Sequence, residues 1–478
     1  MNQNTKQNII ELYQKWADDQ VVNTEMIPPS GSYREYMRII GKKQTVMGVF
    51  NTDKKENNAF VTFSRHFKSK GLPVPEILVV DEIKDIYLQE DFGDTMLFDH
   101  ILQERRGAHF PDSLILTLKK VIKELVRFQI EGGEDLDYSA GYPRASFDKQ
   151  SMMWDLNYFK YYFLKLAKIP FDEQLLEDDY LKFSDYLLDA PCDYFLYRDF
   201  QSRNIMLKDG EPKFIDYQGG RKGALPYDLA SLLYDAKADF PQEVRDELLA
   251  YYIDELSSYE QIDLAAFKSY YYGYILIRMM QAMGAFGFRG FYERKEHFLQ
   301  SIPYALRDLK EVLKHLDFPV ELPEMLASLQ RVCDSKFLKT VGKKKDAKLK
   351  ITIQSFSYLR GISAEAIAAG GFVFDCRVID DPVGNAGFHT EQGSWDALSA
   401  FFTDDTGMPD FLKSINAIID RAVEKYQKQN ERHLNINFGC VGGQHRSVYA
   451  AECLAKHLME KYDVEINLKH LEIENIRQ

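Results

Sequence analysis

The chain has 478 residues and a formal net charge of −13, and apolar residues make up 45% of it. This length is too great for one ordinary hydrophobic core and predicts two or three domains. The negative net charge excludes a global basic field for nucleic acid, although a local basic patch remains open. The five cysteines are too sparse and irregular for a disulfide framework or a zinc ribbon.

The sequence also argues against a membrane protein. The start, Met1 to Asp19, is polar and has no apolar signal region. The most apolar stretch, Tyr270 to Phe288, contains Arg278 and Gln281, which indicates a buried helix and not a membrane span. A cytoplasmic protein without membrane contact is therefore expected.

The first 90 residues are predicted to form a compact lobe of mixed structure. Apolar and polar residues alternate with a period of two in its predicted strands, and helical patterns stand before and between them. A turn over 28–32 leads into the first strand. The expected helices are 4–20 and 57–70, and the expected strands are 33–40, 45–50, 76–81 and 85–90.

Long helical patterns dominate from residue 91 to residue 334 and predict a second, mainly helical lobe. Two short apolar strands, around 194–197 and 213–216, interrupt them. The expected helices are 112–130, 150–167, 173–189, 227–236, 241–256, 262–284 and 295–315.

Residues 335–348 are predicted to be a lysine-rich linker. Seven lysines and one acidic residue lie between Ser335 and Lys350. A solvated tether explains this composition, and a contact with nucleic acid or an acidic partner is the alternative. After this segment an apolar strand pattern begins at Leu349 and returns over 371–378 and over 434–440. These expected strands alternate with expected helices near 394–402, 409–428 and 446–462. This alternation predicts a small α/β domain over 349–478.

Three polar residues stand at a spacing typical of ATP-dependent phosphotransferases. Asp199 and Asn204 share a loop after the strand 194–197, and Asp216 ends the strand 213–216. Phosphoryl transfer needs a carboxylate that orients the acceptor hydroxyl and oxygen ligands that hold magnesium across the phosphates of ATP. We therefore predict Asp199 as the catalytic base, and Asn204 and Asp216 as ligands of Mg²⁺.

The segments around these residues resemble the aminoglycoside phosphotransferase branch of the protein-kinase-like fold. The resemblance is greatest to the anomeric N-acetylmuramate/N-acetylglucosamine kinases (AmgK-type). It implies an α+β protein-kinase-like two-lobed domain over 1–334, with lobes of about 1–90 and 91–334. It also implies an ATP-dependent sugar kinase that transfers phosphate to an alcohol group of an amino sugar. The segments that carry it are 31–36, 197–206, 215–218, 226–233 and 277–286.

The resemblance also implies where ATP binds. Kinases generally carry a phosphate-binding lysine on a strand, but the matching strand, 45–50, has none. We therefore expect nearby arginines and the amides of the 30–32 turn to bind the phosphates. Residues 90–92 are expected to form a hinge that offers backbone groups to adenine. The predicted ATP-binding residues are Ser30, Gly31, Ser32, Arg34, Arg38, Glu90 and Phe92.

Further residues are candidates for the acceptor site. The helix 150–167 is expected to border the acceptor pocket, which makes Asp155 and Asn157 candidates for sugar contacts. Arg278 lies in an apolar helix and needs a partner, so a buried ion pair and a substrate contact are both open. Asp228, at a helix start, is expected to cap that helix or to hold the catalytic loop.

A glycine-containing turn near the C-terminus has the features of a phosphate site. The turn, Cys440 to Ser447, joins a strand to a helix and directs backbone N–H groups toward one point. Arg446 adds a bidentate donor for phosphate. The spacing of Cys440 and Arg446 is also that of Cys-based phosphatases, with Asp380 or Asp381 as the general acid. Both a phosphate-binding site and a phosphatase are therefore open.

Residues 349–478 resemble the C-terminal domain of the RNase adapter protein RapZ. The segments 374–377, 381–382 and 439–449 carry the resemblance, and Val441 stands where that family has threonine. The resemblance implies a pocket for an amino-sugar phosphate and, as a further partner, a small RNA. The implied pocket residues are Asp375, Arg377, Cys440, Gly442, Gly443, His445 and Arg446.

Two hypotheses of different classes follow. The first is an amino-sugar kinase with a C-terminal domain that binds a phosphosugar and regulates it. The second is a metabolite-gated RNA-binding adapter with a weak or inactive kinase domain. Tyr197, which replaces the usual histidine of the catalytic loop, and the missing strand lysine favour the second hypothesis, whereas the net charge of −13 counts against it.

Overall fold

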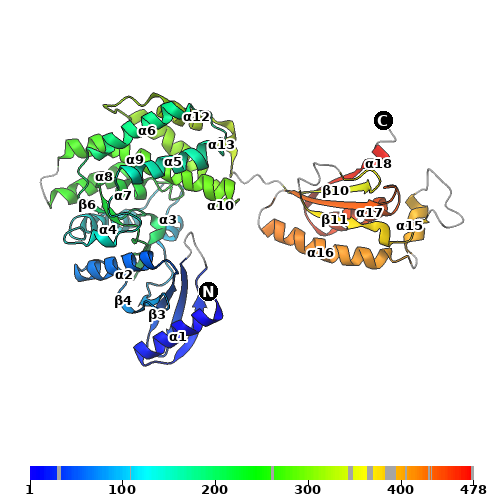
Figure 1. The fold of residues 1–478 in the computed structure, drawn as a ribbon, viewed down its shortest axis with the longest axis horizontal. Coiled ribbons are helices and arrows are strands. Elements are labelled where there is room, and N and C mark those ends of the chain that lie inside the picture. Colours follow the sequence, from blue (N-terminus) through cyan, green and yellow to red (C-terminus); the bar gives the residue numbers. More distant parts are fainter. Residues whose placement is uncertain are drawn as a thin grey trace. The chain divides into compact units, whose positions relative to one another are not determined.

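The protein forms two units, each with its own hydrophobic core (Figure 1). One unit runs from Met1 to Lys343 and the other from Lys344 to Gln478. The structure is a computed structural model. It describes the chain apart from residues 29–33, 108, 260–262, 343–347, 363–369, 383–394, 404–405, 429–430, 432 and 475–478.

The N-lobe of the first unit is an antiparallel sheet with the strand order β1-β2-β3-β5-β4. Alternate side chains of the sheet point to opposite faces. On one face Ile39 and Leu88 pack against Ile9 of α1, and on the other Tyr87 packs against Phe60 of α2. The elements are α1 (Gln3–Ala17), β1 (Val21–Met26), β2 (Glu35–Gly41), β3 (Thr45–Phe50), α2 (Lys54–Ser69), β4 (Ile77–Asp81) and β5 (Ile86–Glu90).

The C-lobe is mainly helical and contains two short antiparallel strand pairs, β6 with β9 and β7 with β8. Its elements up to the second pair are α3 (Leu97–Glu104), α4 (Asp112–Gln129), η1 (Tyr138–Ala140), α5 (Lys149–Phe159), η2 (Lys160–Leu164), α6 (Glu173–Leu188), β6 (Tyr194–Leu196), η3 (Ser202–Asn204), β7 (Ile205–Lys208) and β8 (Glu211–Phe214). The remaining elements are β9 (Arg221–Gly223), α7 (Pro226–Leu233), α8 (Gln242–Ser257), α9 (Leu264–Phe286), η4 (Gly287–Tyr292), α10 (Glu296–Leu299), α11 (Ile302–Val312), η5 (Leu313–His315), α12 (Pro323–Asp334) and α13 (Lys336–Thr340).

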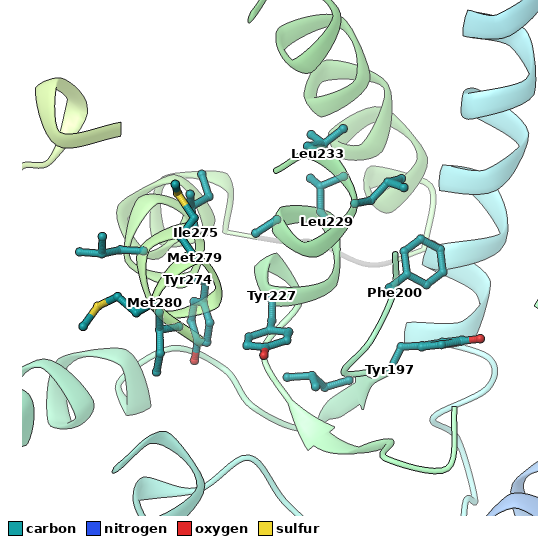
Figure 2. Packing of buried hydrophobic residues seen from close by; sticks show 14 of the residues in the cluster. Tyr197, Phe200, Tyr227, Leu229, Leu233, Tyr274, Ile275, Met279 and Met280 are labelled. Atoms are coloured by element: carbon teal, nitrogen blue, oxygen red, sulfur yellow. The ribbon is translucent and has the colours of Figure 1, made fainter. Parts of the chain in front are cut away.

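Helix α9 lies in the middle of the C-lobe core. It is apolar on most of its circumference, which is typical of a buried helix, and it packs against α5 and α7. Figure 2 shows Tyr274, Ile275 and Met279 on α9, and Tyr227 and Leu229 on α7. The prediction of a buried helix over this stretch is therefore confirmed.

Helices α5 and α9 both continue into π-helical turns, η2 and η4, which contact each other. A Cβ atom on Gly287 would overlap the carbonyl oxygen of Tyr162, so glycine permits this close approach. Such π-helical turns are frequent at functional sites. Here η4 positions Arg289 at the rim of the cavity described below.

The second unit is an open parallel sheet with the strand order β11-β12-β10-β13. Its core contains Ile351, Ile353, Ile436 and Phe438 from the strands and Leu454 from α17. The elements are β10 (Leu349–Ser357), β11 (Phe372–Asp375), η6 (Cys376–Val378), α15 (Trp395–Thr403), α16 (Met408–Lys428), β12 (His433–Cys440), α17 (Arg446–Lys461), β13 (Val464–His470) and α18 (Leu471–Glu474).

Several elements differ from the sequence predictions. The predicted helix 295–315 is two helices, α10 and α11, because Pro303 lacks an N–H and stands in the first turn of a new helix. The first part of the predicted linker is wrong, since α13 forms there and Leu338 is fully buried in the core. Strands β1, β7, β9 and β13 and helices α3 and α12 were not predicted.

Candidate active site

The three residues predicted from spacing lie together at the ends of β6 and β8. The side-chain amide of Asn204 donates to the backbone carbonyl of Asp199 at 2.9 Å and to the carboxylate of Asp216 at 3.1 Å. Because its nitrogen makes both bonds, its Oδ1 atom is left as a ligand oxygen. The side chains of Asp199 and Asp216 also line one cavity of about 620 Å³.

Asp228 at the start of α7 holds the catalytic loop. Its carboxylate accepts the backbone N–H groups of Tyr197 at 2.7 Å and Arg198 at 3.0 Å. Arg198 has a φ of 84°, which is unfavourable for a residue with a Cβ atom. The two hydrogen bonds stabilise this conformation and direct Asp199 toward the cavity. The expected role of Asp228 in holding the loop is confirmed.

Tyr197 stands where the catalytic loop usually has a histidine, and its buried side chain makes a structural contact. Its hydroxyl donates to the carbonyl of Ile215 at 2.6 Å, next to Asp216. The ring packs edge-on against Phe128 and Phe200 in the core. The substitution therefore preserves a connection between the catalytic loop and the strand that precedes Asp216.

The prediction that Asp155 contacts the sugar is wrong, because its carboxylate already binds the Arg198 guanidinium. Both of its oxygens accept from the Arg198 guanidinium, at 2.6 and 2.7 Å, and Asp155 is buried. Asn157 does not line the cavity. Arg278 does line it, so among the three predicted acceptor residues the structure brings only Arg278 to the cavity beside Asp199.

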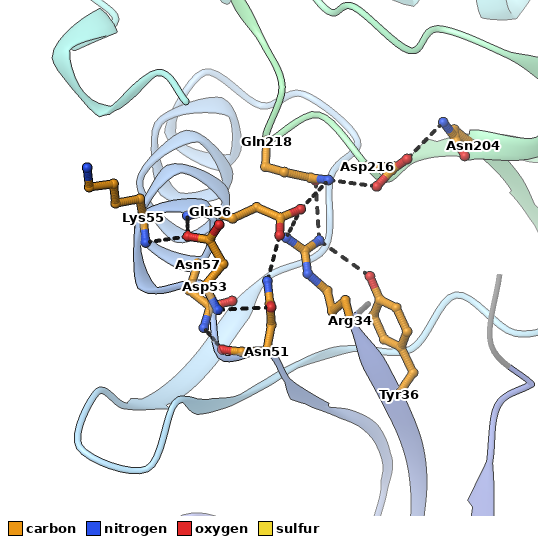
Figure 3. A network of polar contacts seen from close by, with 10 residues as sticks. All are labelled: Arg34, Tyr36, Asn51, Asp53, Lys55, Glu56, Asn57, Asn204, Asp216 and Gln218. Atoms are coloured by element: carbon orange, nitrogen blue, oxygen red, sulfur yellow. Dashed lines mark hydrogen bonds and ion pairs between the residues drawn. The ribbon is translucent and has the colours of Figure 1, made fainter. Parts of the chain in front are cut away.

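A chain of buried polar contacts joins the N-lobe to Asp216 (Figure 3). The Arg34 guanidinium lies 3.2 Å from Oε1 of Glu56 on α2. The Gln218 amide donates to the same Glu56 oxygen at 3.2 Å and to Asp216 at 2.8 Å. Asn51 donates to the other Glu56 oxygen at 2.7 Å. In protein kinases a strand lysine pairs with a glutamate of the equivalent helix. Here an arginine just before β2 makes that type of pair.

Glu56 and Gln218 were missed in the sequence analysis. A local signal for Glu56 exists, since Asp53 and Glu56 have the spacing of a capping box at a helix start. The Asp53 carboxylate caps α2 by accepting the N–H groups of Lys55 and Glu56. For Gln218 the only local signal is its position two residues after Asp216, and its link to α2 appears only in three dimensions.

Arg38 is wrong as a phosphate-binding residue. Its guanidinium donates to the carboxylates of Asp91 at 2.6 Å and Asp94 at 2.7 Å, in the segment after β5. Two carboxylates thus neutralise its charge, and the side chain fixes the hinge between the lobes. The described hinge residues also include Glu90, whose backbone N–H donates to the carbonyl of Glu76.

The other predicted ATP contacts have separate outcomes. Phe92 is buried in the hinge, and its backbone contact with adenine stays a prediction. Ser30, Gly31 and Ser32 lie outside the described residues. Arg34 is buried beside Glu56, with its guanidinium two contacts away from Asp216, and its contact with phosphate also stays a prediction.

The donor set near Asp216 fits a magnesium ion. Burial raises the pKa of the Asp216 carboxyl, and the nearby charge of Asp199 raises it further. A cation between the two carboxylates would relieve this repulsion. No group of three or more His, Cys, Asp or Glu side chains suited to a metal occurs in the described part of the chain. Mg²⁺ needs only one or two carboxylates when phosphates and water complete its shell, so Asp216 and Asn204 suffice.

The predicted residues of the C-terminal turn lie at the carboxyl ends of parallel strands, where open α/β sheets bind ligands. Asp375 ends β11 and Cys440 ends β12, and Asp375 lies opposite Gly439 in the sheet. Gly442 is open to solvent, since a Cβ atom there would meet nothing within 4 Å. Gly443 has a φ of 71°, and its N–H donates to Cys440 Sγ at 3.1 Å.

The two terminal nitrogens of the Arg446 guanidinium are already used in contacts within the domain, so they are not available for a bidentate contact with a phosphate. One guanidinium nitrogen donates to the Ile379 carbonyl at 2.9 Å and the other to Asp381 at 2.6 Å, and the residue is buried. The predicted bidentate phosphate contact is therefore wrong for this conformation. Arg377 is an exposed cation at this edge; it pairs with Asp375 at 2.6 Å and lies over the Tyr358 ring.

The geometry also disfavours a Cys-based phosphatase. Cys440 is 2% exposed, and its sulfur contacts the Ser447 hydroxyl and the Gly443 N–H group. A nucleophilic thiolate needs access to its substrate. Asp381, one candidate for the general acid, is held in the ion pair with Arg446. His445 precedes α17 and makes no side-chain cap.

A two-lobed domain with an Asp–Asn–Asp site beside a cavity defines a kinase-like phosphotransferase domain, followed here by a small parallel α/β domain. Residues 27–264 match the model of the phosphotransferase enzyme family, and residues 349–474 match that of the RapZ C-terminal domain. The chain thus combines a domain of each of these two families. The predicted fold class is confirmed, whereas specificity for N-acetylmuramate or N-acetylglucosamine stays a prediction.

Relatives cover only parts of the chain. A nucleotide-binding protein of Roseobacter denitrificans is 31% identical over 127 residues, which are 27% of this chain and 41% of the relative. One of Methylococcus capsulatus is 30% identical over 124 residues, 26% of this chain and 41% of the relative. The chain thus spans about 41% of the length of these relatives. A solved choline kinase from Cryptosporidium parvum is 13% identical with a TM-score of 0.45, covering 68% of this chain and 99% of that chain.

Within the described residues, no helix combines the length and the apolar character needed to cross a membrane.

Asp228 predicts how stability depends on pH. Burial raises the pKa of its carboxyl from 3.8 to about 7 in the folded state. Between these two values the folded state holds a proton that the unfolded state has released. The contribution of Asp228 is therefore complete below about pH 4 and is lost as the pH rises to about 7. We expect Asp228 by itself to contribute a fall of about 1.4 kcal/mol for each pH unit in this window to the free energy of unfolding of the first unit.

Urea unfolding at several pH values measures this slope in the wild type and in Asp228→Asn. The variant loses an acceptor for one backbone amide, so it should be less stable at pH 4, and it should lack the fall in stability that Asp228 contributes through this window. Asp193→Asn, a change at an exposed aspartate, should keep the wild-type slope. An Asp228→Asn slope equal to that of the wild type would contradict the prediction.

Proposed function

We propose that this protein is an ATP-dependent kinase that phosphorylates an amino sugar of the N-acetylmuramate/N-acetylglucosamine type. The observation that carries the proposal is the arrangement of Asp199, Asn204 and Asp216 beside a cavity of about 620 Å³. A cavity of this size accommodates a monosaccharide with its substituents. A cytoplasmic location, where ATP is available, is part of the same proposal.

In this mechanism Asp199 orients the acceptor hydroxyl and accepts its proton. The hydroxyl oxygen bonds to the γ-phosphorus of ATP while the bond from that phosphorus to the bridging oxygen breaks, and ADP leaves. Asp216 and Oδ1 of Asn204 would hold Mg²⁺, which neutralises charge on the phosphates when it is bound. The Asn204 amide fixes the position of Asp216 relative to the loop that carries Asp199.

Arg34 takes the part of the missing strand lysine in this proposal. Arg34 stands directly before β2, whose first residue, Glu35, lies opposite Phe50 of β3, so Arg34 is next to the strand that lacks the lysine. Its pairing with Glu56 and the contacts of Gln218 support a role in setting the distance between α2 and Asp216. The guanidinium would bind the phosphates of ATP from this fixed position.

The polar lining of the cavity supports a sugar as acceptor. Gln201, Ser231 and Gln281 line it next to the apolar side chains of Met279 and Phe286. Amide and hydroxyl groups bind sugar hydroxyls, and apolar side chains pack against the ring face. Assays with a panel of N-acetylated hexoses would identify the sugar and the hydroxyl that accepts the phosphoryl group.

Asp199→Asn should lower ATP turnover with the best amino sugar by about 10²–10⁴-fold, because an amide cannot accept the proton. ADP release in a coupled assay measures the turnover, and calorimetry with ADP checks that nucleotide binding persists. Asp209→Asn, in the exposed turn between β7 and β8, is the matched control and should keep wild-type turnover. A wild type that turns over no amino sugar and equals Asp199→Asn would refute the kinase proposal.

Arg34→Met should lower kcat/KM for ATP by at least about 10-fold, because it leaves Glu56 without its cation. Arg34→Lys keeps the charge without the planar fork and should lie between Arg34→Met and the wild type. Arg65→Met removes an exposed arginine from the same helix, α2, and should have no effect. Equal kinetics of the wild type and Arg34→Met would show that Arg34 has no part in ATP use.

We also propose that the C-terminal domain binds an amino-sugar phosphate at the turn after β12 and so regulates the kinase. The open backbone at Gly442, the start of α17 and the exposed Arg377 support this site. Arg377 could exchange Asp375 for a phosphate group, since both are oxyanions that accept bidentate hydrogen bonds. An RNA partner and the adapter hypothesis stay predictions, and residues 343–347 of the lysine-rich segment lie outside the described residues.

Arg377→Ala should weaken the binding of glucosamine 6-phosphate by about 10-fold, because one charge-assisted contact is lost. Calorimetry in an Asp199→Asn background measures this binding without turnover. Arg421→Ala changes an exposed arginine of α16 in the same domain and is the control. If the phosphosugar fails to bind to the wild type, or binds equally to Arg377→Ala, the proposed site is wrong.

A further inference from the structure

The cavity beside Asp199 belongs to the C-lobe alone. Every residue that lines it lies between Asp199 and Ala305, and none comes from the N-lobe or the hinge. In a two-lobed kinase the nucleotide lies between the lobes, below the strands of the N-lobe. The cavity is therefore on the acceptor side of Asp199, and the charges that line it act on the acceptor.

The lining is rich in cations, and these divide into two groups. Arg289 and Lys295 both contact the carboxylate of Glu293 at 2.9 Å, so their charge is compensated. Arg203, Lys237 and Arg278 make no ion pair with any carboxylate in the described part of the chain.

Arg278 is the most buried of these cations. It is 7% exposed, and its partners in the described structure are neutral, the Ser231 hydroxyl at 2.9 Å and the Gln281 amide oxygen at 2.7 Å. A guanidinium has five N–H donors, so these two bonds leave donors for a ligand. A buried charge without an ion pair is costly, and a ligand of opposite charge repays that cost.

Arg203, Lys237 and His297 repel one another. Burial lowers the pKa of Lys237, and the charge of Arg203 lowers it further. Burial likewise lowers the pKa of His297, with Lys237, Lys295 and Arg203 adding to the effect. Asp235 is the one acidic neighbour that acts on Lys237, and its carboxylate already accepts the Ser202 hydroxyl at 2.6 Å. The fold thus holds these three side chains close together although their charges repel one another.

A solvated rim of lysines and arginines would not show this pattern. Such side chains point into water and keep their full hydration, whereas Lys237 is half-buried and Arg278 is buried. The Arg203 guanidinium lies over the Phe98 ring, 3.7 Å from its centroid, which fixes its position at the wall. Arg203 and His297 are exposed, so burial holds only Arg278 and Lys237 in place before any ligand arrives, while the Phe98 ring orients Arg203.

We propose that Arg203, Lys237, His297 and Arg278 form an anion subsite that binds a carboxylate or phosphate substituent of the acceptor sugar. This inference rests on the proposed sugar kinase activity and makes it more specific. The subsite would hold the anionic substituent while Asp199 faces the hydroxyl that receives the phosphoryl group. The same positive charge excludes cationic acceptors, because a like charge in the cavity is repelled by Arg203, Lys237 and Arg278.

Three acceptors distinguish the outcomes. N-acetylmuramate carries a carboxylate, N-acetylglucosamine 6-phosphate carries a phosphate, and N-acetylglucosamine carries neither. We expect a higher kcat/KM for one of the anionic acceptors than for N-acetylglucosamine. Lys237→Met and Arg203→Met should each lower kcat/KM for that acceptor by about 10-fold or more, with a much smaller effect on N-acetylglucosamine. If the variants lower kcat/KM for N-acetylmuramate, the subsite binds a carboxylate. If they lower kcat/KM for N-acetylglucosamine 6-phosphate, it binds a phosphate.

Lys268→Met is the matched control, because Lys268 is exposed on α9, the helix of Arg278, and does not line the cavity. It should leave all three acceptors unchanged. A wild type that prefers N-acetylglucosamine, or variants that lower kcat/KM equally for all three sugars, would overturn the anion subsite while leaving the kinase proposal intact.

Binding provides a readout that does not need turnover. Calorimetry with N-acetylmuramate and with N-acetylglucosamine 6-phosphate, in the presence of ADP, should show about 10-fold weaker binding to Lys237→Met than to the wild type for the preferred anion. Equal binding to both proteins, or no binding of either anion to the wild type, would overturn the subsite. If no sugar is phosphorylated but an anion binds as expected, the kinase proposal fails and the subsite stands.

Discussion

The buried contact between Arg34 and Glu56 is the interaction on which the geometry of the active site depends. Arg34 is buried and Glu56 is partly exposed, so removing the Glu56 carboxylate would leave a buried guanidinium without its charge partner, which is destabilising. Helix α2 therefore cannot move away from β2 without this penalty. Because Gln218 donates both to Glu56 and to Asp216, the same contact also fixes the carboxylate predicted to hold magnesium. The position of α2 and the geometry of the phosphoryl-transfer site are thus coupled.

The catalytic loop stores strain that the surrounding C-lobe compensates. Arg198 and Asp216 have φ values of 84° and 68°, and each such residue costs of the order of 1–3 kcal/mol. Asp228 accepts the backbone N–H of Arg198, and Asp155 binds its guanidinium with both oxygens. These two carboxylates, from α7 and α5, are needed to keep Asp199 in place, which explains why Asp155 serves the loop and not the substrate.

The sequence predicted what depends on local spacing. Asp199, Asn204 and Asp216 follow short strands, and the order of strands and helices is sufficient to bring such residues together. The roles of Arg34 and Arg38 could not be separated in this way. Both lie near the predicted phosphate loop, and only the partners of each, Glu56 for one and Asp91 with Asp94 for the other, decide which faces the site. Strand β1 was not predicted because almost all of its residues are exposed, so its sequence lacks the alternation of apolar and polar residues that marks a strand.

The pairing of buried arginines separates structural from ligand-binding positions in this chain. Arg198 is partly buried and Arg446 is buried; each holds a carboxylate, and in both cases the pair fixes a loop. Arg278 is equally buried but has only neutral partners in the described structure, and it lines a cavity. Arg221 is also buried without a carboxylate, but it donates to the Gly219 carbonyl and does not line the cavity, whereas Arg278 lines a cavity from which a ligand can compensate its charge. Since the cavity also contains Asp199, the group that satisfies it arrives with the molecule that is to be phosphorylated.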